Sequence, residues 1–384
     1  MSRIRVLVVD DSVVIRRLLS DVLSEDDRLE VVGTAANGKV ALAKIPQLNP
    51  DLITLDVEMP VMDGLTTLRE LRRLHPRIPV IMFSTLTEKG ARTTLDALEL
   101  GASDYVAKPA NVGSVMQSMA AVRAELVPKV VALCSRVVPA RPRPAVAPLP
   151  SAPAVVRRTE APKRVDLLAI GSSTGGPDAL STVLSALPAS LPVPVVVVQH
   201  MPPVFTRQFA ERLNSKCALT VSEATSGVRL APGHVLIAPG DHHMRLRGAA
   251  GSVHAYLDQG VPENYCRPAV DVLFRSVVEV YGGHVLGVVL TGMGADGARS
   301  SAQVVEAGGE VLVQDQATSV VWGMPGAVAA AGLASAQLPL REVAPAVLTR
   351  IARGRSATPL ATRPATPLAR PATPRPSLLQ GTRR

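Results

Sequence analysis

The sequence predicts an α/β protein of two domains: an N-terminal doubly wound (βα)5 domain and a C-terminal α/β domain built on a parallel sheet. Three observations lead to this prediction. Short runs of β-branched residues alternate with helical stretches, the alternation occurs twice, and a segment rich in proline and alanine separates the two occurrences. With 384 residues, 47% of them hydrophobic, the chain is long enough to bury two ordinary cores.

The first domain is expected over residues 1–130. It opens on "RVLVVDD", which is typical of a buried strand, and apolar residues then recur at helical spacing. These residues are Ile15, Leu18, Leu19 and Val22. "DLITLD" and "PVIMFS" predict further strands, and "GASDYVAKP" contains one more. Five strand and helix units within about 125 residues favour a doubly wound parallel sheet.

A linker is expected over residues 131–164, where periodicity gives way to "VVPARPRPAVAPLPSAPAVVRR". Its prolines favour a semi-extended chain. The second domain is expected over residues 165–352, with candidate strands "VDLLAIG", "VPVVVVQH", "GHVLIAP", "GHVLGVVLTG" and "EVLVQD". Residues 353–384 repeat Ala-Thr-Pro three times and are predicted to form a disordered basic tail.

The positive charge of the chain is confined to the linker and the tail. The net charge is +9, but residues 135–164 carry +6 and residues 353–384 carry +7, which leaves the rest of the chain negative. Only 2% of the residues are aromatic, so a nucleic-acid partner is disfavoured. No apolar run reaches the roughly 18 to 20 residues of a membrane helix, and the cysteines lack metal-ligand spacing. We therefore expect a cytoplasmic protein.

Polar residues follow four strands of the first domain and should meet at one edge of its sheet. Asp10 and Asp11 end the first strand, Asp56 the third, Ser84 the fourth and Lys108 the fifth. The carboxyl ends of parallel strands share one edge, and three carboxylates crowded there need a cation. Oxygen ligands of this kind suit Mg²⁺. One such acid alone is more often a solvated loop residue, but five matching positions are hard to explain in that way.

The stretch "AIGSSTGGP", residues 169–177, follows a predicted strand and precedes a predicted helix, and it has three interpretations. A dinucleotide-binding loop would need glycine where Ser173 stands, and a Walker loop needs the missing Gly-Lys-Ser/Thr. The frame from Gly171 to Gly175 fits G-x-S-x-G, which presents a serine nucleophile on a tight turn. An ordinary turn is the commonest origin of so short a pattern.

A serine nucleophile needs a base and an acid at the same edge of the sheet. His200 ends the strand "VPVVVVQH", whereas His242 and His243 are assigned to a polar turn. Asp296 lies in the glycine-rich loop after "VLGVVLTG", where an aspartate is more often a helix cap. Together with Ser173 these residues form a candidate nucleophile, base and orienting acid. Their order in the chain disfavours the α/β-hydrolase superfamily.

The first domain resembles the response-regulator receiver family over residues 1 to about 125. The resemblance is carried by Asp10-Asp11, by Asp56 with the following "VEMPVMDG", by Ser84 and by Lys108-Pro109. It implies that Asp56 accepts a phosphoryl group from a histidine kinase, while Ser84 and Lys108 bind the phosphoryl oxygens. The Mg²⁺ ligands that it implies are Asp10, Asp11, Asp56 and the backbone carbonyl of Glu58.

The whole chain resembles the CheB family of bacterial chemotaxis, in which a receiver is joined to a methylesterase domain. The motifs are "AIGSSTGGP", "QHMPPVFT", "APGDHHM", "RPAVDVLFRS" and "LTGMGADGA", in that order. The family's catalytic residues fall on Ser173, His200 and Asp296, and backbone donors near Thr174 and Met293 would bind the oxyanion. The implied reaction is hydrolysis of glutamate γ-methyl esters on chemoreceptors, with deamidation of receptor glutamines, and no cofactor in the catalytic domain. The family also implies that the unphosphorylated receiver covers the active site.

Two other functions compete with this one. A receiver-controlled serine esterase or amidase could act on a protein outside chemotaxis, because substrate choice depends on surfaces that sequence does not reveal. A DNA-binding response regulator is disfavoured, because it would need a short basic output module. Contact with a membrane is expected only through the receptors.

Overall fold

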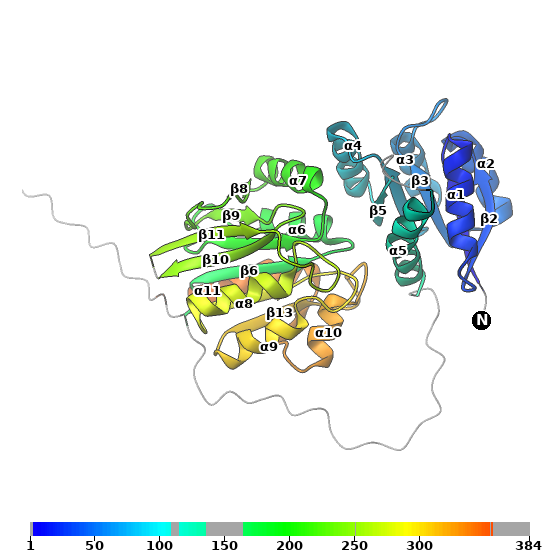
Figure 1. The fold of residues 1–384 in the computed structure, drawn as a ribbon. Helices are drawn as coiled ribbons and strands as arrows, with labels where there is room; N and C mark the ends of the chain where they lie inside the picture. The colour runs from blue at the N-terminus through cyan, green and yellow to red at the C-terminus, as the bar shows by residue number, and fades with distance from the viewer. Residues whose placement is uncertain (1–2, 109–114, 136–163, 250, 354, 356–384) are drawn as a thin grey trace, which may run out of the picture.

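A computed structural model describes the protein over most of its length (Figure 1). The described residues are 3–108, 115–135, 164–249, 251–353 and 355. Within them, no helix combines the length and the apolar character needed to cross a bilayer. The predictions for the central part of the linker and for the tail fall on residues 136–163 and 356–384, which lie outside the described residues.

The N-terminal domain contains a five-stranded parallel sheet in the order β2-β1-β3-β4-β5. The strands are β1 (Ile4–Val9), β2 (Leu29–Ala35), β3 (Leu52–Asp56), β4 (Val80–Ser84) and β5 (Asp104–Ala107). Strand β3 is buried along its whole length, as expected for a strand covered on both faces. The reversal of strand order at β1 confirms the predicted doubly wound (βα)5 fold.

Five helices cover this sheet. They are α1 (Val13–Ser24), α2 (Gly38–Leu48), α3 (Gly64–Leu74), α4 (Glu88–Glu99) and α5 (Val115–Cys134). Apolar residues of α1 and α5 pack on one face, and those of α2, α3 and α4 pack on the other. Polar caps start the first four helices; Ser12, for example, accepts a hydrogen bond from Ile15 N. Helix α5 continues to Cys134, a few residues into the range expected to be linker, because Val130 and Leu133 are buried in the core.

The C-terminal domain contains a seven-stranded parallel sheet in the order β14-β13-β12-β6-β7-β9-β8. The strands are β6 (Leu167–Ser172), β7 (Val195–Gln199), β8 (Thr220–Glu223), β9 (His234–Ile237), β12 (Val285–Val289), β13 (Glu310–Gln314) and β14 (Ala336–Leu338). Five of them were expected. The two edge strands, β8 and β14, are short and partly exposed, so they lack the continuous apolar pattern of buried strands.

Helices cover both faces of this second sheet, and a β-hairpin also packs on one of the two faces. One face carries α6 (Gly176–Ser185), α7 (Pro203–Lys216) and α11 (Leu340–Ala352). The other carries α8 (Val270–Tyr281), α9 (Ala298–Glu306), α10 (Met324–Ala330) and the hairpin of β10 (His243–Ala249) and β11 (Ser252–Asp258). The assignment of His243 to a polar turn was wrong: it begins β10 and is buried, and its Nε2 donates a hydrogen bond to Val261 O.

The order in which successive strands are added to the second sheet reverses between β6 and β12. The chain runs from β6 outward through β7, then returns to β12 on the other side of β6 and continues outward to β13 and β14. In open α/β sheets the crevice outside the carboxyl ends of strands at such a reversal is where ligands bind. The loops after β12, β6 and β7 therefore meet at the expected place for a site.

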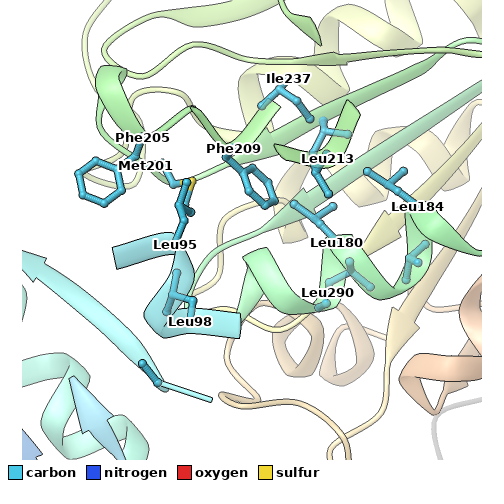
Figure 2. Close-up of a cluster of buried hydrophobic side chains, with 14 of the residues drawn as sticks. Leu95, Leu98, Leu180, Leu184, Met201, Phe205, Phe209, Leu213, Ile237 and Leu290 are labelled. Atoms are coloured by element: carbon cyan, nitrogen blue, oxygen red, sulfur yellow. The ribbon is translucent and has the colours of Figure 1, made fainter. Parts of the chain in front are cut away.

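The two domains pack together through α4 and α7. Leu95 and Leu98 of α4 belong to the same hydrophobic cluster as Phe205 and Phe209 of α7 (Figure 2). The ring of Phe205 also stacks on Tyr105 of β5, with centroids 4.5 Å apart. Around this apolar centre lie ion pairs between the helices: Arg207 with Glu88, Arg212 with Asp96 and Glu99, and Lys216 with Glu99.

Candidate active site and acidic cluster

Ser173 lies directly after β6, on a tight turn that leads into α6. Gly175 adopts a φ of +74°, which a residue with a side chain would rarely take. Gly176 begins α6 so close to Gln199 that a Cβ atom there would lie 2.0 Å from the Gln199 side-chain oxygen. Gln199 Nε2 in turn donates a 2.9 Å hydrogen bond to Ser173 O. The turn therefore holds the Ser173 backbone firmly at the end of the strand.

His200 and Asp296 form a hydrogen-bonded pair at the same edge of the sheet. His200 follows β7, and its Nε2 lies 2.8 Å from Asp296 Oδ2. Burial alone would lower the pKa of the His200 ring, but the hydrogen bond to Asp296 raises it above its ordinary value. For the Asp296 carboxyl both effects have the opposite sign. Burial would raise its pKa, but His200 and two backbone amides hold the pKa below the usual range. Each partner of the pair therefore favours the charged form of the other.

Asp296 is held in place by more than His200. Its Oδ2 accepts a 2.7 Å hydrogen bond from Val270 N, and its Oδ1 accepts bonds from Asp271 N at 3.0 Å and Asn264 Nδ2 at 2.9 Å. Val270 and Asp271 begin α8, so the carboxylate lies at a helix N-terminus, where negative charge is favoured. Asp296 thus contacts both His200 and the first turn of α8, whereas the helix that follows it, α9, has Gly297 as its N-cap.

Ser173 and His200 share a pocket but do not hydrogen-bond to each other. With Nε2 engaged by Asp296, the ring presents Nδ1 to the pocket, and Nδ1 lies 3.4 Å from Cys266 Sγ. The pocket has a volume of about 1050 Å³ and is lined by both serine and histidine. The Cys266 thiol therefore contacts the ring nitrogen that would have to accept the proton of a serine nucleophile.

The N-terminal domain forms one wall of this pocket. Asp104 and Tyr105 of β5 and Lys129 of α5 line it, opposite Ser173 and His200. The hydroxyl of Thr174, the residue after Ser173, donates a 2.7 Å hydrogen bond to Asp104 Oδ2. The pocket thus lies between the domains, and one hydrogen bond ties the serine turn to β5.

Thr174 and Met293 both line the pocket, as their expected role requires. Within the described part of the chain, the backbone N–H groups of these two residues have no hydrogen-bond acceptor, whereas Ser173 N donates to Thr291 O. Free amides that face a pocket can stabilise a developing negative charge. Both unpaired amides therefore belong to residues that line the same pocket as Ser173.

The three acids of the N-terminal domain meet as expected. Carboxylate oxygens of Asp10, Asp11 and Asp56 lie within 4.8 Å of one another. Lys108, after β5, places its Nζ 2.8 Å from Asp56 Oδ1 and 2.9 Å from Asp10 Oδ2. Burial, more than the opposing hydrogen bond from Lys108, raises the pKa of the Asp56 carboxyl to about 6. One lysine is thus insufficient to neutralise the cluster.

The cluster fits a hard divalent cation. Asp56 Oδ2 is buried and accepts no hydrogen bond from any residue that the structure describes. Such an oxygen is costly unless something binds it, and clustered carboxylate oxygens are the donor set that Mg²⁺ prefers. Two of the expected neighbours contact other groups. The hydroxyl of Ser84 donates to Gly90 O at 3.2 Å, and the carboxylate of Glu58 pairs with Lys89 at 2.6 Å.

Sequence reasoning missed several residues of the two sites. Asn264, Asp271 and Cys266 surround the His200–Asp296 pair, and Asp104 contacts the serine turn. None of them follows a strand of the parallel sheet at its carboxyl end, which was the signal used to select candidates. Their proximity to "RPAVDVLFRS", a motif that carries the family resemblance, is the only sequence signal that could have found the first three.

Comparison with known proteins agrees with the two-domain division. Residues 6–120 match the response regulator receiver domain family, and residues 168–347 match the CheB methylesterase family. A protein-glutamate methylesterase/protein-glutamine glutaminase from a Nocardioides species is 56% identical over 92% of this chain and 97% of the relative. A protein of the same name from Trichodesmium erythraeum is 52% identical over 91% of this chain and 100% of the relative.

Among solved structures, the crystal structure of the Thermotoga maritima CheB methylesterase catalytic domain is 42% identical and covers 49% of this chain and 99% of that chain, with a TM-score of 0.47. The two full-length relatives are more informative, because they match both domains at more than half of the aligned positions. This chain therefore belongs to the CheB family of protein-glutamate methylesterase/protein-glutamine glutaminases, hydrolases that carry a response-regulator receiver domain.

Proposed function

We propose that this protein removes methyl groups from glutamate γ-methyl esters of chemoreceptors and deamidates receptor glutamines, under the control of receiver phosphorylation. The observation that carries the proposal is the meeting of Ser173 with the His200–Asp296 pair in one pocket at the carboxyl ends of three adjacent strands. The receiver would occupy residues 1–130 and the catalytic domain residues 165–352, and the reaction would take place in the cytoplasm.

Ser173 is the proposed nucleophile. Its Oγ attacks the ester carbonyl carbon while His200 Nδ1 takes the hydroxyl proton, and the carbonyl oxygen becomes an oxyanion bound by the amides of Thr174 and Met293. The imidazolium returns the proton to the methoxide, so that methanol leaves and an acyl-serine remains. Water then attacks the acyl-serine by the same route, which restores Ser173 and releases the glutamate carboxylate. With a glutamine substrate the first leaving group is ammonia.

His200 and Asp296 have separate parts in these steps. Asp296 holds the proton on Nε2, which leaves the lone pair of Nδ1 for the serine proton. It also stabilises the imidazolium that forms during each attack. For the first step to begin, the His200 ring must exchange its contact with Cys266 Sγ for one with Ser173.

The receiver is proposed to control access to the pocket. Support comes from the contacts that tie it to the catalytic domain: the Tyr105–Phe205 stack, the Thr174–Asp104 hydrogen bond and the ion pairs of Arg212. A histidine kinase would phosphorylate Asp56, and the added charge would draw Lys108 and Ser84 toward the phosphoryl oxygens. Moving a cover from 99% closed to 99% open takes about 5.5 kcal/mol. A single phosphoryl group is therefore expected to activate the enzyme partially.

Phosphorylation would depend on Mg²⁺ held by Asp10, Asp11, Asp56 and the backbone carbonyl of Glu58. When bound, the ion would offset the negative charge of the carboxylates and of the incoming phosphoryl group. Lys108 contributes a second positive charge from the opposite side of Asp56, at Oδ1. The residues themselves therefore orient Asp56 with one oxygen bound and the other, Oδ2, available.

The proposal is tested by Ser173→Ala. Methanol release from methylated chemoreceptor membranes should fall by on the order of 10³-fold or more, because the acyl-enzyme cannot form. Ser172→Ala is the matched control: its hydroxyl donates to Gln199 Oε1 rather than into the pocket, so its rate should stay within about tenfold of the wild type. Methanol release retained by Ser173→Ala would refute the assignment of the nucleophile.

The alternative is a receiver-controlled serine esterase or amidase that acts on a protein outside chemotaxis. It uses the same residues and differs only in substrate. Wild-type protein that hydrolyses a small ester, loses that activity in Ser173→Ala, and releases no methanol from receptor membranes would favour this alternative.

A further inference from the structure

The N-termini of α8 and α9 lie close together. Each helix has its first backbone amides bound by a carboxylate that lies at the beginning of the other helix. Asp296, just before α9, accepts hydrogen bonds from Val270 N and Asp271 N in the first turn of α8. Asp271 Oδ1 in turn accepts bonds from Ser300 N at 2.8 Å and Ser300 Oγ at 2.7 Å, in the first turn of α9. This reciprocal arrangement brings two carboxylates together, one of which contacts His200.

Asn264 joins the two carboxylates. Its Nδ2 donates to Asp271 Oδ2 at 3.0 Å and to Asp296 Oδ1 at 2.9 Å. Among the side chains that the structure describes, it is the one that hydrogen-bonds to both. The backbone of Asn264 adopts a φ of +53°, a left-handed conformation that asparagine tolerates better than most residues. The loop therefore accepts backbone strain at the residue whose amide reaches both acids.

The two carboxylates need such a donor because they are buried. Asp271 is 1% exposed and Asp296 is 2% exposed, so water does not screen their repulsion. In the described part of the chain, the other charged groups near Asp296 are His200, Glu263, Arg275 and Arg299. Glu263 pairs with Arg275 and lies 3.8 Å from Arg299. Without the amide, Asp296 would take up a proton more readily or move away from Asp271. Either change would weaken the hold of Asp296 on His200.

We propose that Asn264 is a positioning residue for the hydrolysis: its side-chain amide bridges Asp271 and Asp296 and so keeps Asp296 ionised and directed at His200 Nε2. The inference rests on the proposed function. It assigns Asn264 no contact with the reacting atoms. Its contribution acts through Asp296, which must carry a full negative charge when the imidazolium forms.

The main variant is Asn264→Gly, which removes the amide but accepts the positive φ without strain. We expect kcat for methanol release to fall by about 10- to 100-fold, as when outer partners of catalytic groups are removed, with KM within about twofold. The acid limb of the kcat profile should move to lower pH, because the neutral His200 ring is the base and its imidazolium is less stabilised when Asp296 is more easily protonated. Asn49→Gly is the control: it makes the same change at an asparagine with a φ of +42° at the end of α2, remote from the pocket.

The second variant, Asn264→Gly/Asp271→Asn, tests the electrostatic reason. It removes one of the two repelling charges, so we expect at least half of the lost activity to return. NMR titration of the His200 ring gives a readout that is independent of substrate. Its pKa should fall in Asn264→Gly, because a protonated Asp296 no longer stabilises the imidazolium, and should rise again in the double variant.

The outcomes separate the inference from the proposed function. Wild-type protein that releases no methanol would refute the proposed substrate, while the His200 titration would still decide the role of Asn264. An Asn264→Gly protein with wild-type kcat, pH profile and His200 titration would overturn the inference. So would a loss of activity that the double variant does not relieve while the His200 titration stays unchanged, because that combination is expected of a residue that only supports the loop.

Discussion

The receiver and the catalytic domain each bury a pair of aspartates at the carboxyl edge of a parallel sheet, but the two pairs are satisfied differently. In the receiver, Asp56 Oδ2 lacks a hydrogen-bond partner among the described residues, and burial raises the pKa of this carboxyl to about 6. In the catalytic domain, Asp296 accepts four hydrogen bonds, and its pKa is held below the usual range despite burial.

This difference in hydrogen bonding indicates which function each group of acids suits. An incompletely satisfied group of acids stores free energy that a cation or a phosphoryl group can release on binding, which suits a switch. A fully satisfied carboxylate has one stable position, which suits the orientation of a catalytic base. The same residue type at equivalent places in two sheets therefore serves opposite purposes, according to the number of donors around it.

The largest effect is expected when the satisfied site is broken. Asp296→Asn should lower kcat for methanol release by on the order of 10³- to 10⁴-fold. Each oxygen of Asp296 accepts two hydrogen bonds. An asparagine would replace one of these oxygens by an NH₂ group, which would then face two other donors. If the amide faces His200 Nε2, the ring proton moves to Nδ1, which can then no longer accept the serine proton.

Asp10→Asn is the matched change in the receiver. It reduces repulsion in an incompletely satisfied cluster, so the basal rate of methanol release should stay within about twofold of the wild type. Comparable losses of basal activity in the two variants would remove the distinction drawn between the sites.

A smaller effect is expected from the pH dependence of receiver stability without Mg²⁺. Because the folded-state pKa of Asp56 is raised, the folded receiver binds more protons than the unfolded chain between about pH 4 and pH 6. Its free energy of unfolding should therefore fall as pH rises from about 4 to above 6, by about 1.5 kcal/mol between pH 5 and pH 7.5. Urea unfolding of the full chain in EDTA at pH 5 and pH 7.5 measures this change.

Asp56→Asn supplies the reference for that measurement, because it cannot titrate and cancels contributions from other groups. The wild type should lose more stability than Asp56→Asn between the two pH values, and millimolar Mg²⁺ should reduce the difference. An identical pH dependence in wild type and variant would show that the Asp56 carboxyl is not perturbed by burial.

The smallest effect is expected at an aspartate that links the two regions. Asp104 Oδ2 accepts a hydrogen bond from Thr174 Oγ1 and lies 3.4 Å from Lys129 Nζ. Asp104→Asn removes its charge and should weaken the closed arrangement by about 1 kcal/mol, which corresponds to a basal rate about fivefold higher. Methanol release without acetyl phosphate measures it, and Asp26→Asn, in an ion pair with Arg28 remote from the interface, should have no such effect. An unchanged rate in Asp104→Asn would count against inhibition through this contact.

Strand ends proved to be a good guide to part of the two sites. Asp10, Asp11, Asp56 and Lys108 converge, and so do His200 and Asp296, because parallel strands bring their carboxyl ends to one edge whatever lies between them. The short edge strands β8 and β14 escaped prediction, since their exposed positions break the apolar pattern. Their absence from the prediction did not affect the site, which lies at the centre of the sheet.

The contacts of individual side chains could not be predicted in the same way. Ser84 ends β4 as expected, yet its hydroxyl is bound to Gly90 O, and Ser173 enters the pocket without a hydrogen bond to His200. Asn264 and Cys266 lie in a loop without periodicity, and they reach His200 and Asp296 only because the chain turns through left-handed residues there. Local sequence pattern carries no information on such approaches.

The sequence by itself determined the doubly wound first domain, the parallel-sheet α/β second domain, the acids at the receiver edge and the order of Ser173, His200 and Asp296. Hydrophobic periodicity places strand ends, and strand ends place these residues. Only the tertiary structure decided which carboxylate oxygens of these aspartates accept hydrogen bonds. Hydrogen bonds to Asp296 come from α8 and from the loop at Asn264, and the wall of the pocket comes from β5 and α5 of the other domain. Those donors are distant in the chain, and their effect on a buried charge depends on separations of a few tenths of an ångström.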